Sequence, residues 1–63
     1  KLSDRQLEVM RLLYEGKSDS EIADKLFISL NTVNNHRKNS FRKVGVHSFP
    51  EFMRYAMQNN LFK

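Results

Sequence analysis

Four asparagines lie close together in the middle of the chain, in a stretch that contains no acidic residue. Residues 29–46 read SLNTVNNHRKNSFRKVGV and include Asn31, Asn34, Asn35 and Asn39. A carboxamide on a short stem offers both an acceptor and donors, which suits it to recognising another hydrogen-bonding edge. Asparagine is a mediocre helix former, because its amide competes for nearby backbone groups. Four of them in one segment therefore suggest a role other than local stability.

The charges of the chain are unevenly distributed. There are 11 basic and 7 acidic residues, giving a net charge of +4. Six of the acids lie in residues 1–24, beside four bases. From residue 25 to residue 50 there is no acid, and the bases are Lys25, Arg37, Lys38, Arg42 and Lys43. This asymmetry predicts a polyanionic partner for the second half of the chain, and an ordinary solvated helix face is the alternative.

Length and composition narrow the class of protein. A chain of 63 residues makes one small domain, near the lower limit for a single hydrophobic core. With 40% hydrophobic and 29% charged residues, it is typical of a soluble globular protein. The absence of cysteine excludes disulfides and thiolate metal sites. No apolar run is long enough for a membrane span and no signal peptide is visible. Because the chain starts at Lys1, we expect it to be cut from a longer protein.

The sequence predicts four helices, over residues 4–15, 19–26, 30–44 and 49–59, and no strands. Three of them begin with a serine followed three residues later by Gln or Glu, the pattern of a capping box. These pairs are Ser3 with Gln6, Ser18 with Glu21, and Ser48 with Glu51. Ser29 is expected to be a simple N-cap, and Gly16 and Gly45 lie where helices should end. The predicted fold is an all-α four-helix bundle.

The core is predicted from the apolar face of each helix. At 100° per residue, Val33, Arg37, Ser40 and Val44 fall on one side of the third helix, flanked by His36 and Phe41. Ser40 can donate a hydrogen bond to the carbonyl of residue 36. The opposite side of this helix is polar, basic and free of acids, with Asn31, Asn34, Asn35, Lys38 and Arg42. The other helices should bury Val9, Leu12, Leu13, Ile22, Ala23, Leu26, Phe52, Met53 and Ala56.

Catalysis and metal binding are poorly supported. His36 and His47 are the two histidines, and neither has cysteine or carboxylate partners at ligand spacing. Serine, histidine and aspartate are all present, but the serines are placed as helix caps and no glycine-rich elbow exists. There is no phosphate-binding loop. We therefore expect no enzyme activity, no catalytic residue, no metal and no cofactor.

The second and third helices, joined by a turn at residues 27–29, form a helix-turn-helix. Nearly the whole chain, through the closing AMQNNLF, resembles the LuxR/FixJ/GerE-type DNA-binding domain of bacterial transcription regulators. The resemblance is carried by LS-x-R at the start, EG-x-S with EIA-x-x-L, and IS-x-x-TV-x-x-H followed by K-x-GV. It makes residues 1–63 one such domain, expected in the C-terminal part of a longer regulator.

The resemblance implies a mode of action. The third helix would enter the major groove of double-stranded DNA, in a homodimer on an inverted repeat that forms through the last helix. The residues facing bases would be Asn34, Asn35 and Lys38, and those holding phosphates would be Thr32, Arg37, Arg42 and Lys43. RNA polymerase is a further candidate partner. Such a response regulator or ligand-sensing regulator would act in the bacterial cytoplasm, at the nucleoid when bound, without contacting a membrane.

Three positions depart from the family pattern. Asn34 stands where lysine is common, Ser40 replaces an Ile or Leu, and Phe49 stands where arginine is frequent. These departures leave the operator sequence open.

Two other functions remain possible for this sequence. One is the promoter-reading region of a sigma factor, which has a similar EIA-x-x-L run. The other is a protein-interaction helical module without DNA binding.

Overall fold

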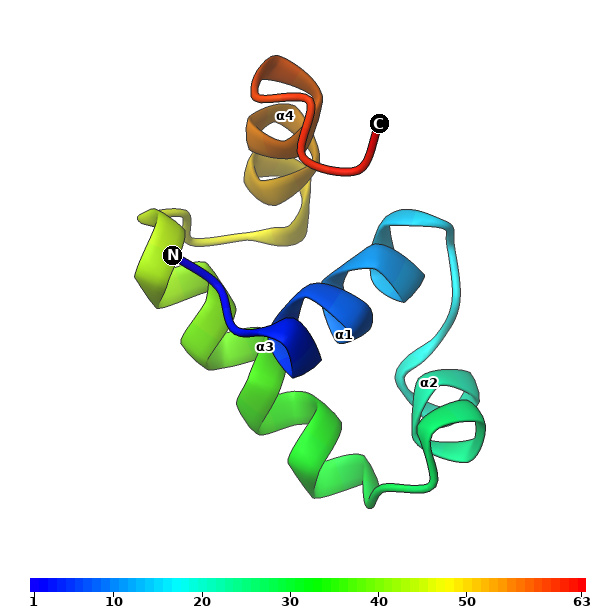
Figure 1. Cartoon of the computed structure of the whole chain (residues 1–63). Helices are drawn as coiled ribbons and strands as arrows, with labels where there is room; N and C mark the ends of the chain where they lie inside the picture. Colours follow the sequence, from blue (N-terminus) through cyan, green and yellow to red (C-terminus); the bar gives the residue numbers. More distant parts are fainter.

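The computed structural model describes all 63 residues and consists of four helices joined by short turns (Figure 1). The helices are α1 (Asp4–Tyr14), α2 (Asp19–Leu26), α3 (Leu30–Val44) and α4 (Phe49–Gln58). The all-α prediction is confirmed, and α2 and α3 have the expected bounds. α1 and α4 each end one residue earlier than expected. None of the four is both long and apolar enough to cross a membrane.

Two of the three predicted capping boxes are confirmed. In α1, the N–H of Gln6 donates to Ser3 Oγ at 3.2 Å, and the N–H of Ser3 donates to Gln6 Oε1 at 3.0 Å. In α2, Ser18 and Glu21 form the same reciprocal pair at 3.1 and 2.8 Å. Ser29 caps α3 as expected.

The third predicted box, at the start of α4, is wrong in one of its two bonds. Ser48 Oγ accepts the N–H of Glu51 at 3.3 Å, but the Glu51 carboxylate accepts the N–H of His47 at 2.6 Å instead of that of Ser48. The backbone explains the difference. The φ of Ser48 is −153°, whereas the serines of the two complete boxes lie at −73° and −79°. The N–H of Ser48 therefore points in another direction, and the N–H before it takes the carboxylate.

All four helices are closed by a residue in the left-handed backbone region. The next residue in each case donates its N–H to the carbonyl five positions earlier, the 6→1 bond of a Schellman motif. Gly16 and Gly45 do this for α1 and α3, as the sequence predicts. α2 and α4 use Phe27 and Asn60, at φ 57° and 51°. A phenylalanine in this region is strained, and it fixes the sharp turn between α2 and α3.

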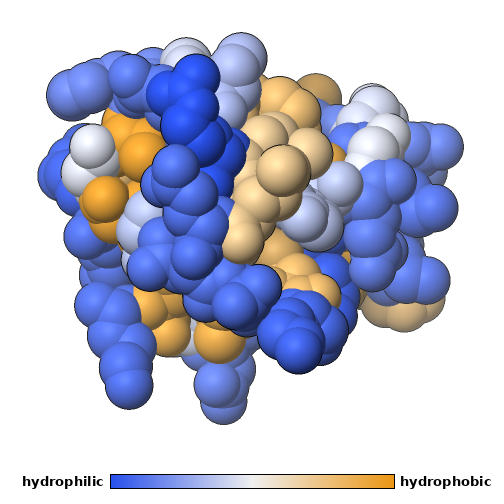
Figure 2. All heavy atoms as spheres, turned by 90° about the horizontal axis from the view of Figure 1, so that it is seen from above, coloured by the Kyte–Doolittle hydropathy of each residue, from blue (hydrophilic) through white to orange (hydrophobic).

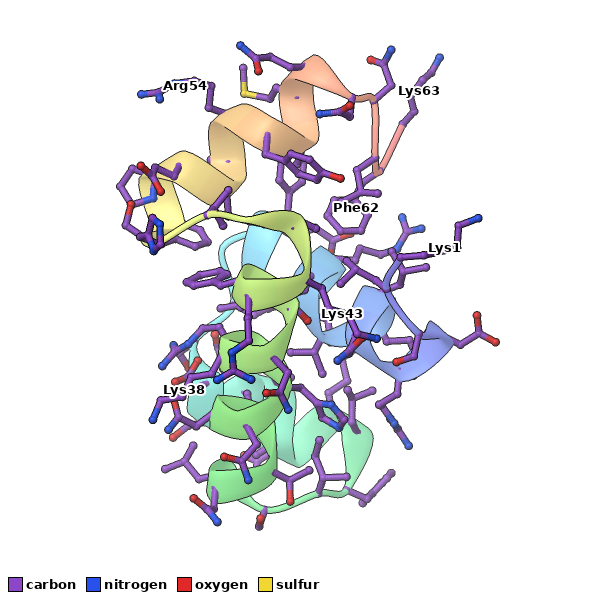
Figure 3. The ribbon with its side chains drawn as sticks, turned by 90° about the vertical axis from the view of Figure 1, so that its left-hand side faces the viewer. Lys1, Lys38, Lys43, Arg54, Phe62 and Lys63 are labelled. Atoms are coloured by element: carbon purple, nitrogen blue, oxygen red, sulfur yellow. The ribbon has the colours of Figure 1, made fainter.

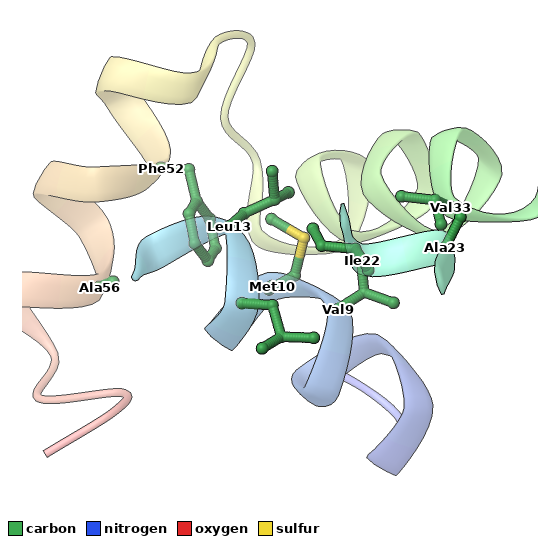
Figure 4. Close-up of a cluster of buried hydrophobic side chains, with 9 residues drawn as sticks. Val9, Met10, Leu13, Ile22, Ala23, Val33, Phe52 and Ala56 are labelled. Atoms are coloured by element: carbon green, nitrogen blue, oxygen red, sulfur yellow. The ribbon is translucent and has the colours of Figure 1, made fainter. Parts of the chain in front are cut away.

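A single hydrophobic core ties the helices together (Figure 4). Val9 and Met10 of α1, Ile22 of α2, Val33 of α3 and Phe52 of α4 are all fully buried. Of the residues predicted to face the core, Leu26, Arg37, Val44 and Met53 are only partly buried, and Met10 was not predicted.

Helix α4 lies at one end of the molecule, beyond α1 and away from α2 (Figure 1). It is attached mainly through Phe52, whose ring stacks on Phe41 of α3 at a centroid distance of 5.9 Å. After α4 the chain turns back, so that Phe62 packs on Tyr14 at 5.3 Å and lies 5.4 Å below the guanidinium of Arg11. α1, α2 and α3 pack on one another, which leaves the outer side of α3 uncovered.

Candidate nucleic-acid interface

The uncovered side of α3 is a strip of four exposed polar side chains, Asn31, Asn35, Lys38 and Arg42. At 100° per residue they fall within about 60° around the helix axis. α3 contains no acidic residue, so nothing on the helix itself neutralises the strip. We call these four residues the outer strip. Its carboxamides can donate and accept hydrogen bonds, and its two cations can bind anions.

The beginning of α3 is fixed by its own first turn. Ser29 Oγ accepts the N–H of Thr32 at 3.0 Å, and the two hydroxyl oxygens lie 2.9 Å apart. Thr32 is therefore held at the helix N-terminus, where unpaired backbone N–H groups and the helix dipole favour an anion. It lies about 100° around the axis from Asn31, on the border of the outer strip.

Arg37 lies on the other border, turned toward α2. Its Nη1 donates to both carboxylate oxygens of Asp19, at 3.0 and 2.8 Å. Its Nη2 donates to Asn34 Oδ1 at 2.7 Å. The side chains of Arg37 and Asp19 are 31% and 29% exposed, so the pair is partly shielded from water. The three residues form one hydrogen-bonded chain from α2 to α3, which we call the Asp19–Arg37–Asn34 chain.

The N-terminus of α2, which carries Asp19, is itself well defined. The Ser18 N–H donates to the carboxylate of Glu21, and this bond lowers the pKa of Glu21 below its usual value of 4.5. The Ser18 hydroxyl and the charge of Lys17 act in the same direction, while partial desolvation opposes them. The charged carboxylate is therefore the form that holds the cap of α2.

The remaining two cations are placed differently. Arg42 is exposed on the outer strip, and its Nη1 donates to Asn39 Oδ1 at 3.0 Å. Lys43 points to the opposite side of α3 from Lys38, toward the N-terminus of the chain (Figure 3). Its ammonium donates to Gln6 Oε1 at 3.2 Å and to the Lys1 carbonyl at 3.3 Å.

The structure therefore places the predicted site residues in different surroundings. Asn35, Lys38 and Arg42 lie together on the outer strip, with Asn34 at its margin. Arg37 is bound to Asp19, a partner that the sequence reading missed because the two are 18 residues apart. The predicted bond of Ser40 is confirmed: its hydroxyl is fully buried and donates to the His36 carbonyl at 2.7 Å.

Comparison with known sequences identifies the family of this chain. Residues 1–56 match the family described as "Bacterial regulatory proteins, luxR family". The chain belongs to this luxR family. It is also 40% identical over 62 residues to the "Oxygen regulatory protein NreC" of Staphylococcus aureus strains JH9 and JH1. That alignment covers 98% of this chain but 29% of each relative, so the chain spans less than a third of the length of these relatives.

Membership of the luxR family confirms the resemblance read from the sequence. It makes the α2–turn–α3 unit the helix-turn-helix of a DNA-binding transcription regulator. The sigma-factor alternative gives way to this assignment, because the match runs through α1, α2, α3 and most of α4. The family is one of regulatory proteins, in keeping with the expectation that the chain is not an enzyme.

Proposed function

We propose that this domain binds double-stranded DNA sequence-specifically, with the outer strip of α3 in the major groove. The observation that carries the proposal is the strip itself: two carboxamides and two cations, exposed and in line, on a helix without an acid. A major groove admits one α-helix, and amide side chains can read the base edges there. Asn35 and Lys38 would read bases from the centre of the strip and Asn34 from its margin.

Phosphate contacts would come from the ends and borders of the same helix. Arg42 is exposed and carries no ion pair, so its charge is available to a phosphate. Thr32 and the N–H groups at the start of α3 would hold a second phosphate, and Lys43 a third if it leaves Gln6. Arg37 retains donors for a phosphate beyond those that bind Asp19 and Asn34, but its charge is balanced by Asp19.

A homodimer on an inverted repeat is the assembly we propose, formed through α4. Met57 is 62% exposed and Phe49 is 39% exposed. On the end of the molecule above α4, apolar groups appear as separate patches between hydrophilic ones (Figure 2). Leu61 and Phe62 are partly buried against the core, so they offer little apolar surface to a partner. With so few exposed apolar side chains on α4, we expect a monomer or a weak dimer in solution. Two copies would pair on DNA, with half-sites about 10 base pairs apart.

Three measurements test the proposed function. Binding to random duplex should weaken as salt rises, with a log–log slope of about −0.9 for each phosphate neutralised. Selection from a random-sequence duplex library should then recover an inverted repeat. A protein-interaction module without DNA binding would show neither the salt dependence nor any enriched sequence. Sedimentation without DNA completes the test, since a tight dimer there would contradict pairing on the operator.

The same proposal places the domain in a wider setting. As part of a transcription regulator it would act in the bacterial cytoplasm, at the nucleoid when bound, and RNA polymerase is a candidate partner. Residues 1–63 would act as a single DNA-binding unit.

A further inference from the structure

We propose that Asp19, acting through Arg37, determines which base Asn34 reads. This inference rests on the proposed function and concerns a residue of α2, outside the helix that would enter the groove. The Asp19–Arg37–Asn34 chain would turn the amide of Asn34 so that only its N–H groups face DNA. Asn34 would then select guanine, whereas an unconstrained asparagine selects adenine.

The orientation of the Asn34 amide follows from the chemistry of its partner. A guanidinium has donors only, so the atom of Asn34 that lies 2.7 Å from Arg37 Nη2 must be the carbonyl oxygen Oδ1. The amide nitrogen Nδ2 then points away from Arg37. Arg37 is held in turn by two bonds from Nη1 to Asp19, at 3.0 and 2.8 Å, in a partly shielded position. A planar guanidinium fixed on one side by a carboxylate has little freedom to release the amide on the other.

The base preference follows from which end of the Asn34 amide can reach a base. Asparagine reads adenine with two bonds, in which Oδ1 accepts from the N6 amine and Nδ2 donates to N7. Because Oδ1 is turned toward Arg37, Nδ2 is the end of the amide that Asn34 would turn toward a base. Guanine presents two acceptors in the major groove, N7 and O6, whereas adenine presents N7 beside a donor amine. An amide that offers only N–H groups therefore suits guanine and faces an unfavourable donor on adenine.

Asn35 provides the internal contrast. It is the next residue on α3 and it is exposed, and the two α3 asparagines that accept a hydrogen bond from an arginine are Asn34 and Asn39. Both ends of its amide are free, so it can read adenine with two bonds. Two neighbouring asparagines would thus read different bases, because only one of them is held by α2.

The test is selection from a random-sequence duplex library with the unaltered chain and four variants. Asn34→Ala identifies the base pair read by Asn34, as the one position whose preference disappears. Arg37→Met removes the donor that occupies Oδ1, and Asp19→Ala removes the carboxylate that anchors Arg37. Asp24→Ala is the matched control, because it removes the same charge from an exposed position on the same helix. Circular dichroism melts establish that each variant is folded.

At the Asn34 position, we expect the unaltered chain to prefer guanine over adenine at least about fivefold. Arg37→Met should reverse this preference, Asp19→Ala should weaken or reverse it, and Asp24→Ala should leave it unchanged. At the base pair read by Asn35, the unaltered chain and all four variants should prefer adenine. A preference for adenine in the unaltered chain, or a guanine preference that survives Arg37→Met, would overturn the inference while leaving sequence-specific binding intact. If Asn34→Ala alters no position, the inference fails as well. No enriched sequence from the unaltered chain would overturn the proposed function itself, and the inference with it.

Discussion

Helix α3 contains the same local interaction twice, in two different surroundings. Asn34 accepts from Arg37 at 2.7 Å, and Asn39 accepts from Arg42 at 3.0 Å, each across three residues of the helix. The first pair is partly shielded and completed by Asp19 of α2. The second is exposed and has no carboxylate. A local sequence pattern therefore sets the bond, while the neighbouring helix decides whether the arginine charge is available to a ligand.

The two pairs also point in different directions. Arg42 lies on the outer strip, within about 20° of Asn31 around the axis, whereas Arg37 lies about 120° away on the side of α2. We infer that the Asn39–Arg42 pair serves backbone binding and that the Asn34–Arg37 pair serves base selection. The following predictions separate the two roles.

The largest expected difference is between the asparagines on the best operator. Asn35→Ala should cost about 1–3 kcal/mol of binding free energy, because two bonds to one base are lost, and Asn34→Ala should fall toward the lower end of that range. Asn39→Ala should have little effect, since its amide only supports Arg42. Fluorescence titrations on cognate and scrambled duplex at one salt concentration measure this. Equal losses on both duplexes would mean that the asparagines only position the backbone.

The next expected difference lies in the salt dependence of the two arginines. Arg42→Ala should lower the magnitude of the log–log slope by about 0.9 and weaken all duplexes alike, because it removes one phosphate contact. Arg37→Ala should change the slope less, because Asp19 already balances its charge. Titrations on random duplex over a range of salt give both slopes. Equal changes in the two variants would mean that Arg37 leaves Asp19 when DNA binds.

The contrast between the two pairs shows what the sequence could and could not predict. The helices, most caps and the outer strip follow from local rules. A serine before a run with helical spacing of apolar residues predicts a helix start, and a rotation of 100° per residue predicts which side chains share a face. The spacing of Asn34 and Arg37 is equally visible. That Asp19 binds Arg37 is not, since it depends on how α2 crosses α3 after the strained turn at Phe27. Phe27 itself, the left-handed end of α2, could not be predicted because glycine usually fills that position.

Stability should show a smaller difference between the pairs. A double-mutant cycle with Asp19→Ala and Arg37→Met should give a coupling of about 0.5–1 kcal/mol, in the upper part of the range for partly exposed ion pairs. The matched cycle with Asn39→Ala and Arg42→Met should give a coupling near zero, because both side chains are exposed. Urea unfolding of the free domain provides the four free energies in each cycle. If the coupling between Asn39 and Arg42 were as large as that between Asp19 and Arg37, shielding from water would not explain the difference between the pairs.

The smallest expected effect concerns the helix end that carries Asp19. The Ser18 N–H lowers the pKa of Glu21 in the folded chain, so the charged carboxylate stabilises the fold at neutral pH. Because the folded pKa lies below the unfolded one, this contribution is complete above the unfolded pKa and disappears as pH falls through the folded pKa. Glu21→Gln should keep the cap, as Gln6 does in α1, but lose its pH dependence.

Thermal melts of the unaltered chain and of Glu21→Gln, taken from neutral to acidic pH, test this effect. The unaltered chain should melt slightly higher at neutral pH, and the two melting temperatures should converge in acid. Glu8→Gln is a suitable control, because Glu8 lies on α1 in an exposed pair with Arg5 at 3.3 Å and takes no part in a cap. If Glu21→Gln and Glu8→Gln respond to pH alike, the bond from Ser18 contributes nothing specific. If they differ as expected, the charged cap stabilises the N-terminus of α2, the helix end that also carries Asp19.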